Sequence, residues 1–334
     1  MLDIFKKIAA AQGVTGNEND TAGVIAELMS QYTDDISIDN LGNLIAVKKG
    51  TGEAPQKIML CAHMDEIGFM VTYIEKNGFL RIAPIGGIDY CSIAYTRVRS
   101  ERGVRGIVAP EAKVKAADYR ADNFFIDIGA KSDKEAARRV KIGETFRFDN
   151  DIVKLMGTRV YGHPIDDRIG CAVIVDIARR LDKVEVKDDI YYVFSVQEEV
   201  GLRGSKTAAY AIEPDIALAF DVTGTGDVPG DTPMACEVGG GAAIKIKDSS
   251  VICDPSLVDE LIAVAKENKI KYQLEVLLYG GTDTASMQMS RGGSRAGALS
   301  IPARYIHSAN EMIDMSDAEA CASLAAEFIK GQSK

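Results

Sequence analysis

The sequence predicts an α/β protein whose sheet is covered by helices and whose chain carries a small β-rich insert. Three observations lead to this prediction. Strand-like and helix-like segments alternate in both outer parts of the 334-residue chain. The middle consists instead of short strand-like runs separated by Gly, Asn and charged turns. The composition, 46% hydrophobic and 26% charged, is that of an ordinary globular protein, and the length allows two domains.

The outer parts supply the elements of the main sheet and its covering helices. Apolar runs and alternating patterns predict strands at 36–39, 44–48, 57–62, 189–196, 215–220, 272–278 and 296–301. Helical spacing of apolar residues predicts helices over 166–181, 256–268 and 316–329. Asp254 is placed to cap the second of these helices.

The middle of the chain predicts the insert. Short strands are expected at 68–75, 79–83, 93–98, 104–108, 124–128 and 145–148. One helix is expected near 132–140, because Ser132 and Glu135 have the spacing of a capping box. We therefore expect an inserted β-rich domain at 68–160 and a catalytic domain made from 1–67 and 161–334.

Composition and charge narrow the classes of function. The chain has 39 basic and 49 acidic residues, a formal net charge of −10, which disfavours a broad nucleic-acid or anionic-membrane surface. No stretch approaches the ~18 apolar residues of a membrane-spanning helix. The apolar run at 8–11 is too short for a signal-peptide core. The six cysteines form no CxxC pair, so we expect buried free thiols and a cytoplasmic location.

Histidine and acidic residues follow several of the expected strands. His63 ends the apolar run KIMLCA, and Asp65 lies two residues further on. Sites of α/β proteins lie outside the carboxyl ends of strands, and a carboxylate can orient the second nitrogen of a metal-binding imidazole. A solvated strand end is the alternative reading. Asp166 and Asp167 open a helical segment, where capping alone would also explain them.

Two adjacent glutamates, Glu198 and Glu199, follow the strand at 189–196. Neighbouring acids at the end of a buried strand repel each other unless a cation or a proton lies between them. An exposed turn is the alternative. Successive side chains in an extended segment point in opposite directions, so we expect one glutamate to bind metal and the other to move protons.

Further along the chain, Asp221 ends a strand and His307 precedes the last helix. The glycines at 224–230 do not form a dinucleotide-binding loop, because Pro229 replaces the third glycine and no amphipathic helix follows. His163 is ambiguous between a site residue and a loop residue.

A two-metal site needs a bridging carboxylate plus one histidine and one acid for each ion. The chain supplies that set with Asp166, His63, Asp221, His307 and Glu199, and Glu198 is then free as a base. Imidazole and carboxylate ligands together suit zinc, cobalt or manganese.

Several longer motifs resemble the glutamyl aminopeptidase or tetrahedral aminopeptidase family of dinuclear metallopeptidases, whose members are often labelled endoglucanase M. The matching stretches run almost from end to end of the chain: GVTGNE at 13–18, DNLGNLIAVKKG at 39–50, AHMDEIGFMV at 62–71, DDRIGCAV at 166–173, VQEEVGLRGS at 196–205, DVTGTGD at 221–227, GGTDTASMQ at 280–288 and IHSANEMID at 306–314. The segment 161–165, YGHPI, departs from the Lys-Ala-apolar run of many members, which leaves the side-chain preference open.

The resemblance implies roles for particular residues. By position, His63 and Asp221 would bind one ion and Glu199 and His307 the other, with Asp166 bridging both. Glu198 would be the general base, and Asp65, also in the catalytic set, would be the partner of His63. The resemblance also implies an α/β/α phosphorylase/hydrolase-like (zinc-peptidase-like) catalytic domain and two divalent ions per subunit, with Zn as the first choice and Co or Mn as alternatives. The resemblance implies that the inserted β domain drives dimerisation and assembly into a homo-oligomer of twelve subunits, a dodecamer.

The expected function is that of a metal-dependent aminopeptidase that removes N-terminal residues from peptides. A glycoside hydrolase is one alternative; it needs no metal, but adjacent glutamates at one strand end suit it poorly, and the chain has no Trp. A metal-dependent deacylase or carboxypeptidase on the same scaffold is another. A non-catalytic assembly protein is the third, although every inferred ligand is present. Loss of activity in a chelator would separate the metal enzymes from the glycosidase.

Overall fold

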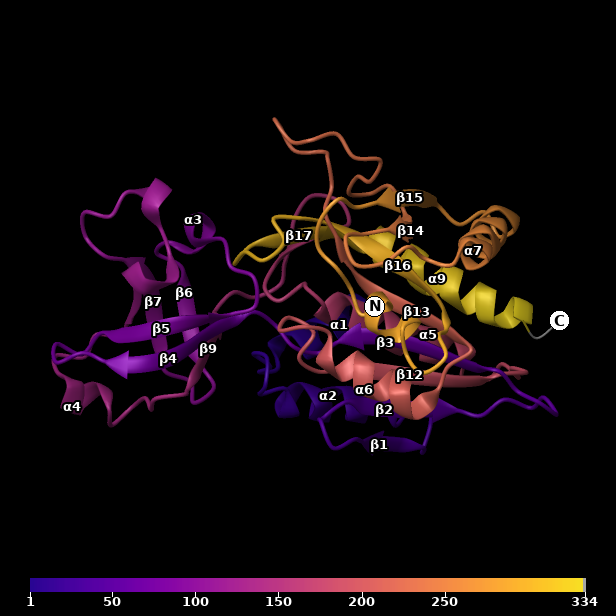
Figure 1. Cartoon of the computed structure of the whole chain (residues 1–334), viewed down its shortest axis with the longest axis horizontal. Coiled ribbons are helices and arrows are strands. Elements are labelled where there is room, and N and C mark those ends of the chain that lie inside the picture. Colours follow the sequence, from indigo (N-terminus) through magenta and orange to yellow (C-terminus); the bar gives the residue numbers. More distant parts are fainter. Residues whose placement is uncertain (333–334) are drawn as a thin grey trace.

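A mixed sheet forms the centre of the larger part of the molecule (Figure 1). The computed structural model describes residues 1–332. The main path of the 11-stranded sheet runs through β1 (Ile36–Ile38), β2 (Leu44–Lys48), β12 (Asp189–Ser195), β3 (Lys57–His63), β13 (Ile216–Thr223), β16 (Arg295–Arg304), β17 (Glu311–Asp314), β11 (Arg159–Gly162) and β10 (Val153–Lys154). Off this path, β14 (Ala242–Lys247) pairs with β16 and with β15 (Tyr272–Val276).

The central strands are parallel, which brings their carboxyl ends to one edge. β3 pairs in parallel with both β12 and β13, and β13 pairs in parallel with β16. The register sets His63 beside Ser195 and Asp221 beside Ser300. Ligand sites of such sheets lie beyond this edge.

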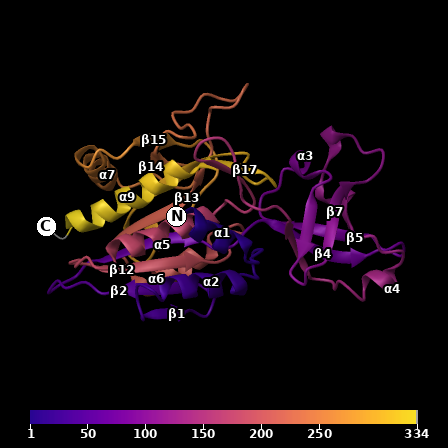
Figure 2. The same cartoon turned by 180° about the vertical axis from the view of Figure 1, so that it is seen from behind.

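Helices cover both faces of the sheet, as the two views in Figures 1 and 2 show. One face carries α1 (Leu2–Ala10), α2 (Asn19–Met29), α5 (Arg168–Leu181), α7 (Pro255–Glu267) and α9 (Met315–Gln332). The other face carries α6 (Arg203–Ile212) and α8 (Thr284–Gln288). Alternate side chains of β3 divide between the two cores: Leu60 packs with the first set of helices and Cys61 with the second. The predicted α/β/α layering is confirmed.

The β-rich middle of the chain forms a small closed barrel beside this sheet (Figures 1 and 2). Around the barrel the strands are β4 (Gly68–Ile74), β5 (Leu80–Ile85), β8 (Phe124–Asp127), β7 (Arg105–Pro110), β6 (Arg97–Ser100) and β9 (Thr145–Phe148). Short helices α3 (Tyr90–Ile93) and α4 (Asp133–Ala136) and two 3₁₀ turns at 116–118 and 121–123 join them. The barrel has a core of its own, in which Phe69 and Phe148 meet edge to face at 5.6 Å.

The barrel is joined to the sheet by a buried ionic junction. Glu66 lies just before β4 and is fully buried. Its carboxylate is 3.1 Å from Nε of Arg147 on β9 and 3.0 Å from Nη2 of Arg168 on α5. Arg147 also donates to the carbonyl oxygens of Ala9 and Ala11 at the end of α1. The arginines hold the pKa of Glu66 at about 2: burial alone would raise it, but Arg147 and Arg168 outweigh that effect.

Most expected elements are confirmed, and three details are corrected. The helix expected from 166 begins at Arg168, because Asp167 is its N-cap and accepts a hydrogen bond from Gly170 N. The strand expected at 93–98 is wrong: α3 ends at Ile93 and β6 begins at Arg97. Asp89 accepts from Cys91 N and starts that helical turn, which the apolar pattern did not indicate.

The third detail is the helix expected at 132–140, which covers only 133–136 as α4. Ser132 caps it as expected, since its Oγ accepts from Glu135 N at 3.3 Å. The Glu135 carboxylate, however, reaches the backbone of Lys131 and not that of Ser132. Beyond α4 the chain continues in turns, in which the backbone N–H groups of Arg139 and Val140 both donate to the carbonyl oxygen of Ala136.

All six cysteines are unpaired, and five of them are buried. Cys91 contradicts the expectation of burial, because it lies exposed in α3 at the outside of the barrel. In residues 1–332, no helix is both long and apolar enough to span a membrane.

Candidate metal centre

The candidate residues lie together beyond the carboxyl edge of the parallel strands. His63 is the last residue of β3, and Asp221 lies near the end of β13. Glu198 and Glu199 follow β12 by a few residues. Asp166 comes from the connection between β11 and α5, and His307 from the connection after β16. The fold thus unites five segments that are far apart in the sequence.

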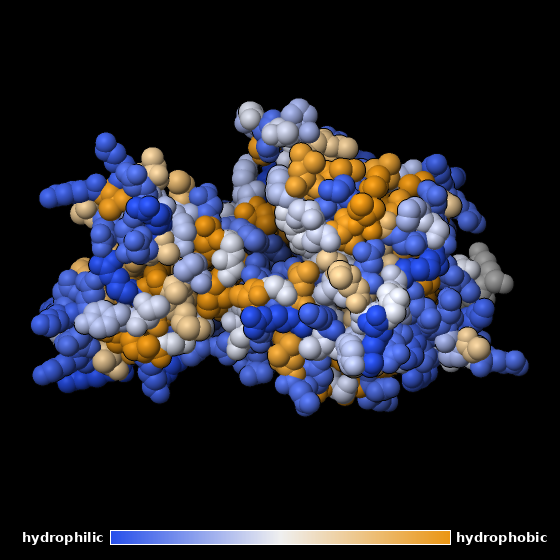
Figure 3. Space-filling model, in the orientation of Figure 1, coloured by the Kyte–Doolittle hydropathy of each residue, from blue (hydrophilic) through white to orange (hydrophobic). Residues whose placement is uncertain are grey.

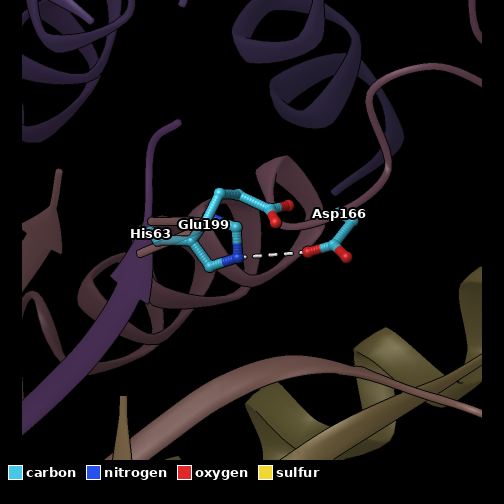
Figure 4. A group of neighbouring side chains, drawn as sticks. All are labelled: His63, Asp166 and Glu199. Atoms are coloured by element: carbon cyan, nitrogen blue, oxygen red, sulfur yellow. Dashed lines mark hydrogen bonds and ion pairs between the residues drawn. The ribbon is translucent and has the colours of Figure 1, made fainter. Parts of the chain in front are cut away.

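Asp166 lies between the two histidines. Its Oδ1 is 3.1 Å from Nε2 of His63, and its Oδ2 is 3.3 Å from Nε2 of His307. Figure 4 shows the first of these contacts, with Glu199 beside the His63 ring. One carboxylate therefore faces two imidazoles through its two different oxygens, which is the placement that a bridging ligand needs.

Each histidine has a further acid beside it. His63 Nε2 is 3.9 Å from Oδ1 of Asp221, and His307 Nε2 is 3.4 Å from Oε1 of Glu199. Ligand atoms of His63, Asp166 and Glu199 all lie within 4.8 Å of one another, and so do ligand atoms of His63, Asp167 and Asp221. The N-cap Asp167 therefore also approaches the cluster.

Asp65 joins His63 to the glutamates. Its Oδ1 lies 3.4 Å from Nδ1 of His63 and accepts a hydrogen bond from Glu198 N at 3.0 Å. Its Oδ2 accepts from Glu199 N at 3.2 Å and from Thr15 Oγ1 at 2.9 Å. Asp65 is fully buried. The expected contact with His63 is present, and the same carboxylate also fixes the backbone that carries both glutamates.

Glu198 and Glu199 do not point in opposite directions. Both side chains line the same cavity. The chain is not extended at this point, because Gln197 adopts a positive φ of 57° between β12 and the two acids. Their surroundings nevertheless differ. Glu199 meets His307, whereas the charges that act on Glu198 come first from His63 and Asp221.

Burial and like charge dominate the electrostatics of the cluster. Burial raises the pKa of Glu198 and of Asp221 well above the ordinary carboxyl range, and neighbouring acids add to the effect. Burial would also raise the pKa of Asp166, but the two histidines more than offset it and hold that pKa below its usual range. For His307, burial lowers the pKa, but the neighbouring carboxylates of Asp166 and Glu199 raise it to about 12.

The donor set fits divalent metal ions. More carboxylates than imidazoles converge in a buried space, which is costly unless cations share it. Glu199 Oε1 is buried and accepts no hydrogen bond from residues 1–332. Imidazole nitrogen and carboxylate oxygen are the ligands of zinc, cobalt and manganese sites.

Glu311 is a residue of this region that sequence reasoning missed. It is buried, and its Oε2 accepts from the backbone N of Ile165 at 2.7 Å and of Asp166 at 3.2 Å. Its Oε1 accepts from His307 N at 3.0 Å, where the backbone has a positive φ of 61°. One carboxylate thus holds the two segments that present Asp166 and His307. Glu311 lies within the motif at 306–314, but nothing in its local sequence indicates this role.

Asp283 is a second missed residue. It is buried beneath the glutamates and accepts from Ser195 Oγ at 2.6 Å and from Ser205 Oγ at 2.5 Å. These serines stand on either side of the loop that carries Glu198 and Glu199. Asp283 therefore ties both ends of that loop to the segment before α8.

His163, which was ambiguous from sequence, belongs to the ionic junction. Its Nε2 is 3.2 Å from Oε2 of Glu66, and its Nδ1 lies 3.2 Å from the carbonyl oxygen of Ser308. Its ring packs edge to face on Phe148 of the barrel at 4.8 Å. His163 therefore links the segment that carries Asp166 and the segment that carries His307 to the barrel.

Comparisons with known proteins agree with this architecture. The model of a family described as M42 glutamyl aminopeptidase matches residues 42–324. A putative aminopeptidase from Acetivibrio thermocellus is 48% identical over 330 residues, 98% of either chain. The structure resembles that of aminopeptidase APDkam598 from the archaeon Desulfurococcus kamchatkensis with a TM-score of 0.94 at 36% identity, covering 98% of this chain and 94% of that one. It also resembles a Pyrococcus horikoshii TET1 peptidase, described as able to assemble into a tetrahedron or a large octahedral shell, with a TM-score of 0.87 at 30% identity and 98% coverage of both chains.

Proposed function

Because the chain belongs to the M42 glutamyl aminopeptidase family, we propose that this aminopeptidase hydrolyses the first peptide bond of peptides at a site for two divalent metal ions, with Glu198 as general base. One observation carries the proposal: the two oxygens of Asp166 face two different histidines, each of which has a second acid beside it. The glycosidase alternative gives no reason for this arrangement.

The residues divide into two ligand groups. His63 and Asp221 would hold one ion, and His307 and Glu199 the other, with Asp166 shared. Zinc fits the donor set best, and cobalt or manganese would also be accepted. When bound, such ions supply Lewis acidity: they polarise a carbonyl group and lower the pKa of water.

Glu198 moves the proton. Its carboxyl lines the cavity, and Glu198 is not a member of either ligand group. Burial raises its pKa, which favours a carboxyl group that can hold and release a proton. It takes a proton from the attacking water and delivers it to the nitrogen of the leaving amine. Asp65 is a positioning residue here, because its two oxygens hold the backbone N–H groups of Glu198 and Glu199.

A screen of aminoacyl-p-nitroanilides, with zinc, cobalt and manganese added in turn to metal-depleted protein, tests the function. We expect release of nitroaniline that a chelator abolishes and metal restores, and elemental analysis should give two ions per chain. N-acetylated substrates should not be cleaved, because an aminopeptidase needs a free amino group. Full activity in chelator would contradict the metal mechanism, and preference for blocked substrates would indicate the deacylase alternative.

We further propose that the catalytic domain comprises 1–67 and 161–334. The 68–160 segment would then hold copies of the chain together in the expected dodecamer. Support comes from apolar side chains exposed on the barrel, among them Met70, Tyr73, Tyr95 and Ile107. In Figure 3 the barrel forms a lobe at one end of the molecule, joined to the larger part below a notch. Light scattering of the full chain, compared with a chain in which a short linker replaces 70–158, tests the assembly. A full chain that is monomeric at micromolar concentration would contradict it.

The unpaired cysteines support a reducing compartment, and we propose the cytoplasm. Mass spectrometry after alkylation of unreduced protein from cells should find all six thiols modifiable once the chain is unfolded. Disulfide-linked peptides in that digest would contradict this location.

A further inference from the structure

The cavity that contains the candidate metal ligands also has an outer part, which none of the roles above explains. The cavity measures about 550 Å³, enough for a side chain beyond the scissile bond. Its outer walls come from the end of β13 and the chain that follows it, from the segment 277–282 after β15, and from the end of β16. The N-terminal side chain of a peptide bound at the cluster would have to enter a space of this kind.

The walls of this outer part combine apolar side chains with threonines and tyrosines, and they carry few charges. Val222 and Val228 line it from the first segment, Leu277 from the second, and Ala303 and Ile306 from the third. Beyond the metal cluster, its charged lining residues within the described chain are Asp231 and Arg304. Asp231 is exposed at the outer side. Among the described residues of this outer lining, Arg304 is therefore the cation that an entering acidic side chain would meet.

Arg304 already has a partner. Its Nε donates to Asp227 Oδ1 at 2.8 Å and its Nη2 to Asp227 Oδ2 at 2.6 Å, a two-point contact. Asp227 is itself fixed, because it also accepts from Thr225 Oγ1 at 2.7 Å and from Val238 N at 3.0 Å. The hydrogen bond from Arg304 holds the pKa of Asp227 at about 2, so the pair stays ionised near neutral pH.

Asp227 occupies Nε and Nη2 of Arg304 and balances its charge, so a substrate carboxylate could take over this two-point contact only by displacing Asp227. That exchange gains one carboxylate–guanidinium contact and loses another, and it leaves the side chain of Asp227, which is only 16% exposed, without its cation. Asp231 adds repulsion. An apolar side chain needs no such exchange and gains contact with the walls.

We propose that this site selects peptides whose N-terminal residue has an uncharged, apolar side chain, and that the Asp227–Arg304 pair makes it reject N-terminal glutamate and aspartate. The inference rests on the proposed aminopeptidase function and specifies its substrate class. It also differs from the preference that the family's description names.

Measuring kcat/KM for leucyl-, lysyl- and glutamyl-p-nitroanilide with the metal-loaded protein tests the proposal. We expect leucine to exceed glutamate by roughly 10–100-fold, the range for a charged hydrogen-bonded group left without a partner. Leucine should also exceed lysine. Glutamate or lysine as the best substrate would overturn the inference, whereas failure to cleave all three would overturn the proposed function instead.

The variant Asp227→Asn releases Arg304 and should reduce the ratio of leucine to glutamate by about tenfold or more, mainly through a lower KM for glutamate. The matched control is Glu260→Gln, which breaks the pair with Arg295 at the opposite end of β16 and should leave the ratio unchanged. A folded Asp227→Asn protein with the wild-type ratio would overturn the inference.

Arg304→Gln supplies a second test. Combined with Asp227→Asn, so that no carboxylate is left without its cation, it should change the leucine-to-glutamate ratio by less than about threefold relative to the wild type, since no substrate carboxylate uses Arg304. A selective loss of glutamate activity would show that Arg304 serves the substrate, and the inference would be wrong.

Discussion

Replacing Glu311 by Gln tests whether its carboxylate sets the distance between Asp166 and His307. The carboxylate accepts three backbone N–H groups, two through Oε2 and one through Oε1. A Gln side chain has one accepting oxygen, and its NH₂ group cannot accept. If the amide oxygen stays with Ile165 and Asp166, the N–H of His307 is orphaned; if it turns, the other two are orphaned.

The magnitude follows from this count. Each buried N–H without a partner costs about 1–3 kcal/mol, which is roughly a 5- to 150-fold change in an equilibrium constant. Since only the metal-loaded state requires both ligands in one arrangement, we expect much of the cost to appear in metal affinity. A loss of about 10–100-fold is usual when the partner that orients a metal ligand is removed. Saturating metal should restore most of kcat.

The assay is a zinc titration of metal-depleted protein in a chelator buffer, together with the cobalt absorption spectrum, which reports ligand geometry. Glu319→Gln, an exposed change on α9, is the matched control. The reasoning is refuted if Glu311→Gln binds both ions with wild-type affinity and gives a wild-type cobalt spectrum.

Three further predictions concern the glutamates and the ionic junction. Glu198→Gln should keep both metals and lose on the order of 10²–10⁴ in kcat. Glu199→Gln should instead lose affinity for one ion, and excess zinc or cobalt should partly restore its activity. Elemental analysis and kinetics distinguish the two variants, and the reverse pattern would mean that the roles of Glu198 and Glu199 must be exchanged. Arg147→Met should destabilise the chain by about 3–5 kcal/mol in urea unfolding, because it leaves Glu66 buried without one of its cations; a loss below about 1 kcal/mol would mean that Arg168 and His163 suffice. Because the pKa of Glu66 is about 2 in the folded chain and 4.5 as an ordinary carboxyl, the stability that it contributes should be complete above about pH 4.5 and lost as the pH falls towards 2. Glu66→Gln should therefore unfold more easily than the wild type at pH 7, with the difference shrinking in acid, and a constant difference would contradict this.

The sequence predicted the parallel strands and the residues at their ends because both leave local signals. Runs such as KIMLCA at 57–62 are buried on both faces, and polar residues directly after them are unusual unless they serve a site. Asp166 and Asp167 show the limit of this reasoning: capping explains Asp167, whereas Asp166, one residue earlier, faces the histidines. Nothing in the local pattern distinguishes the two acids.

The missed elements and residues depend on contacts between distant segments. The helix α6 begins after a left-handed Leu202, and its apolar face consists mostly of small residues, so its spacing gave a weak signal. Glu311, Asp283 and His163 each contact the backbone or a side chain of a segment more than 70 residues away. Their importance lies in where three or four chain segments meet, and no short window of sequence contains that information.

The barrel's first strand, β4, pairs with its last, β9, with Phe69 beside Phe146. The chain therefore enters and leaves the insert at neighbouring points. The entropy of closing a loop depends on the freedom of the chain within it. Once the barrel has folded, its roughly 80 residues have little freedom left, and the entropic cost of closing the loop between β3 and the later strands approaches that of a short connection. The parallel pairing of β3 with β12, across the whole of residues 64–188, can then form at a far smaller entropic cost than the length of chain suggests. We accordingly expect the barrel to order before the sheet, and the metal centre, which needs the ends of β3, β12 and β13 together, to be among the last parts of the molecule to form.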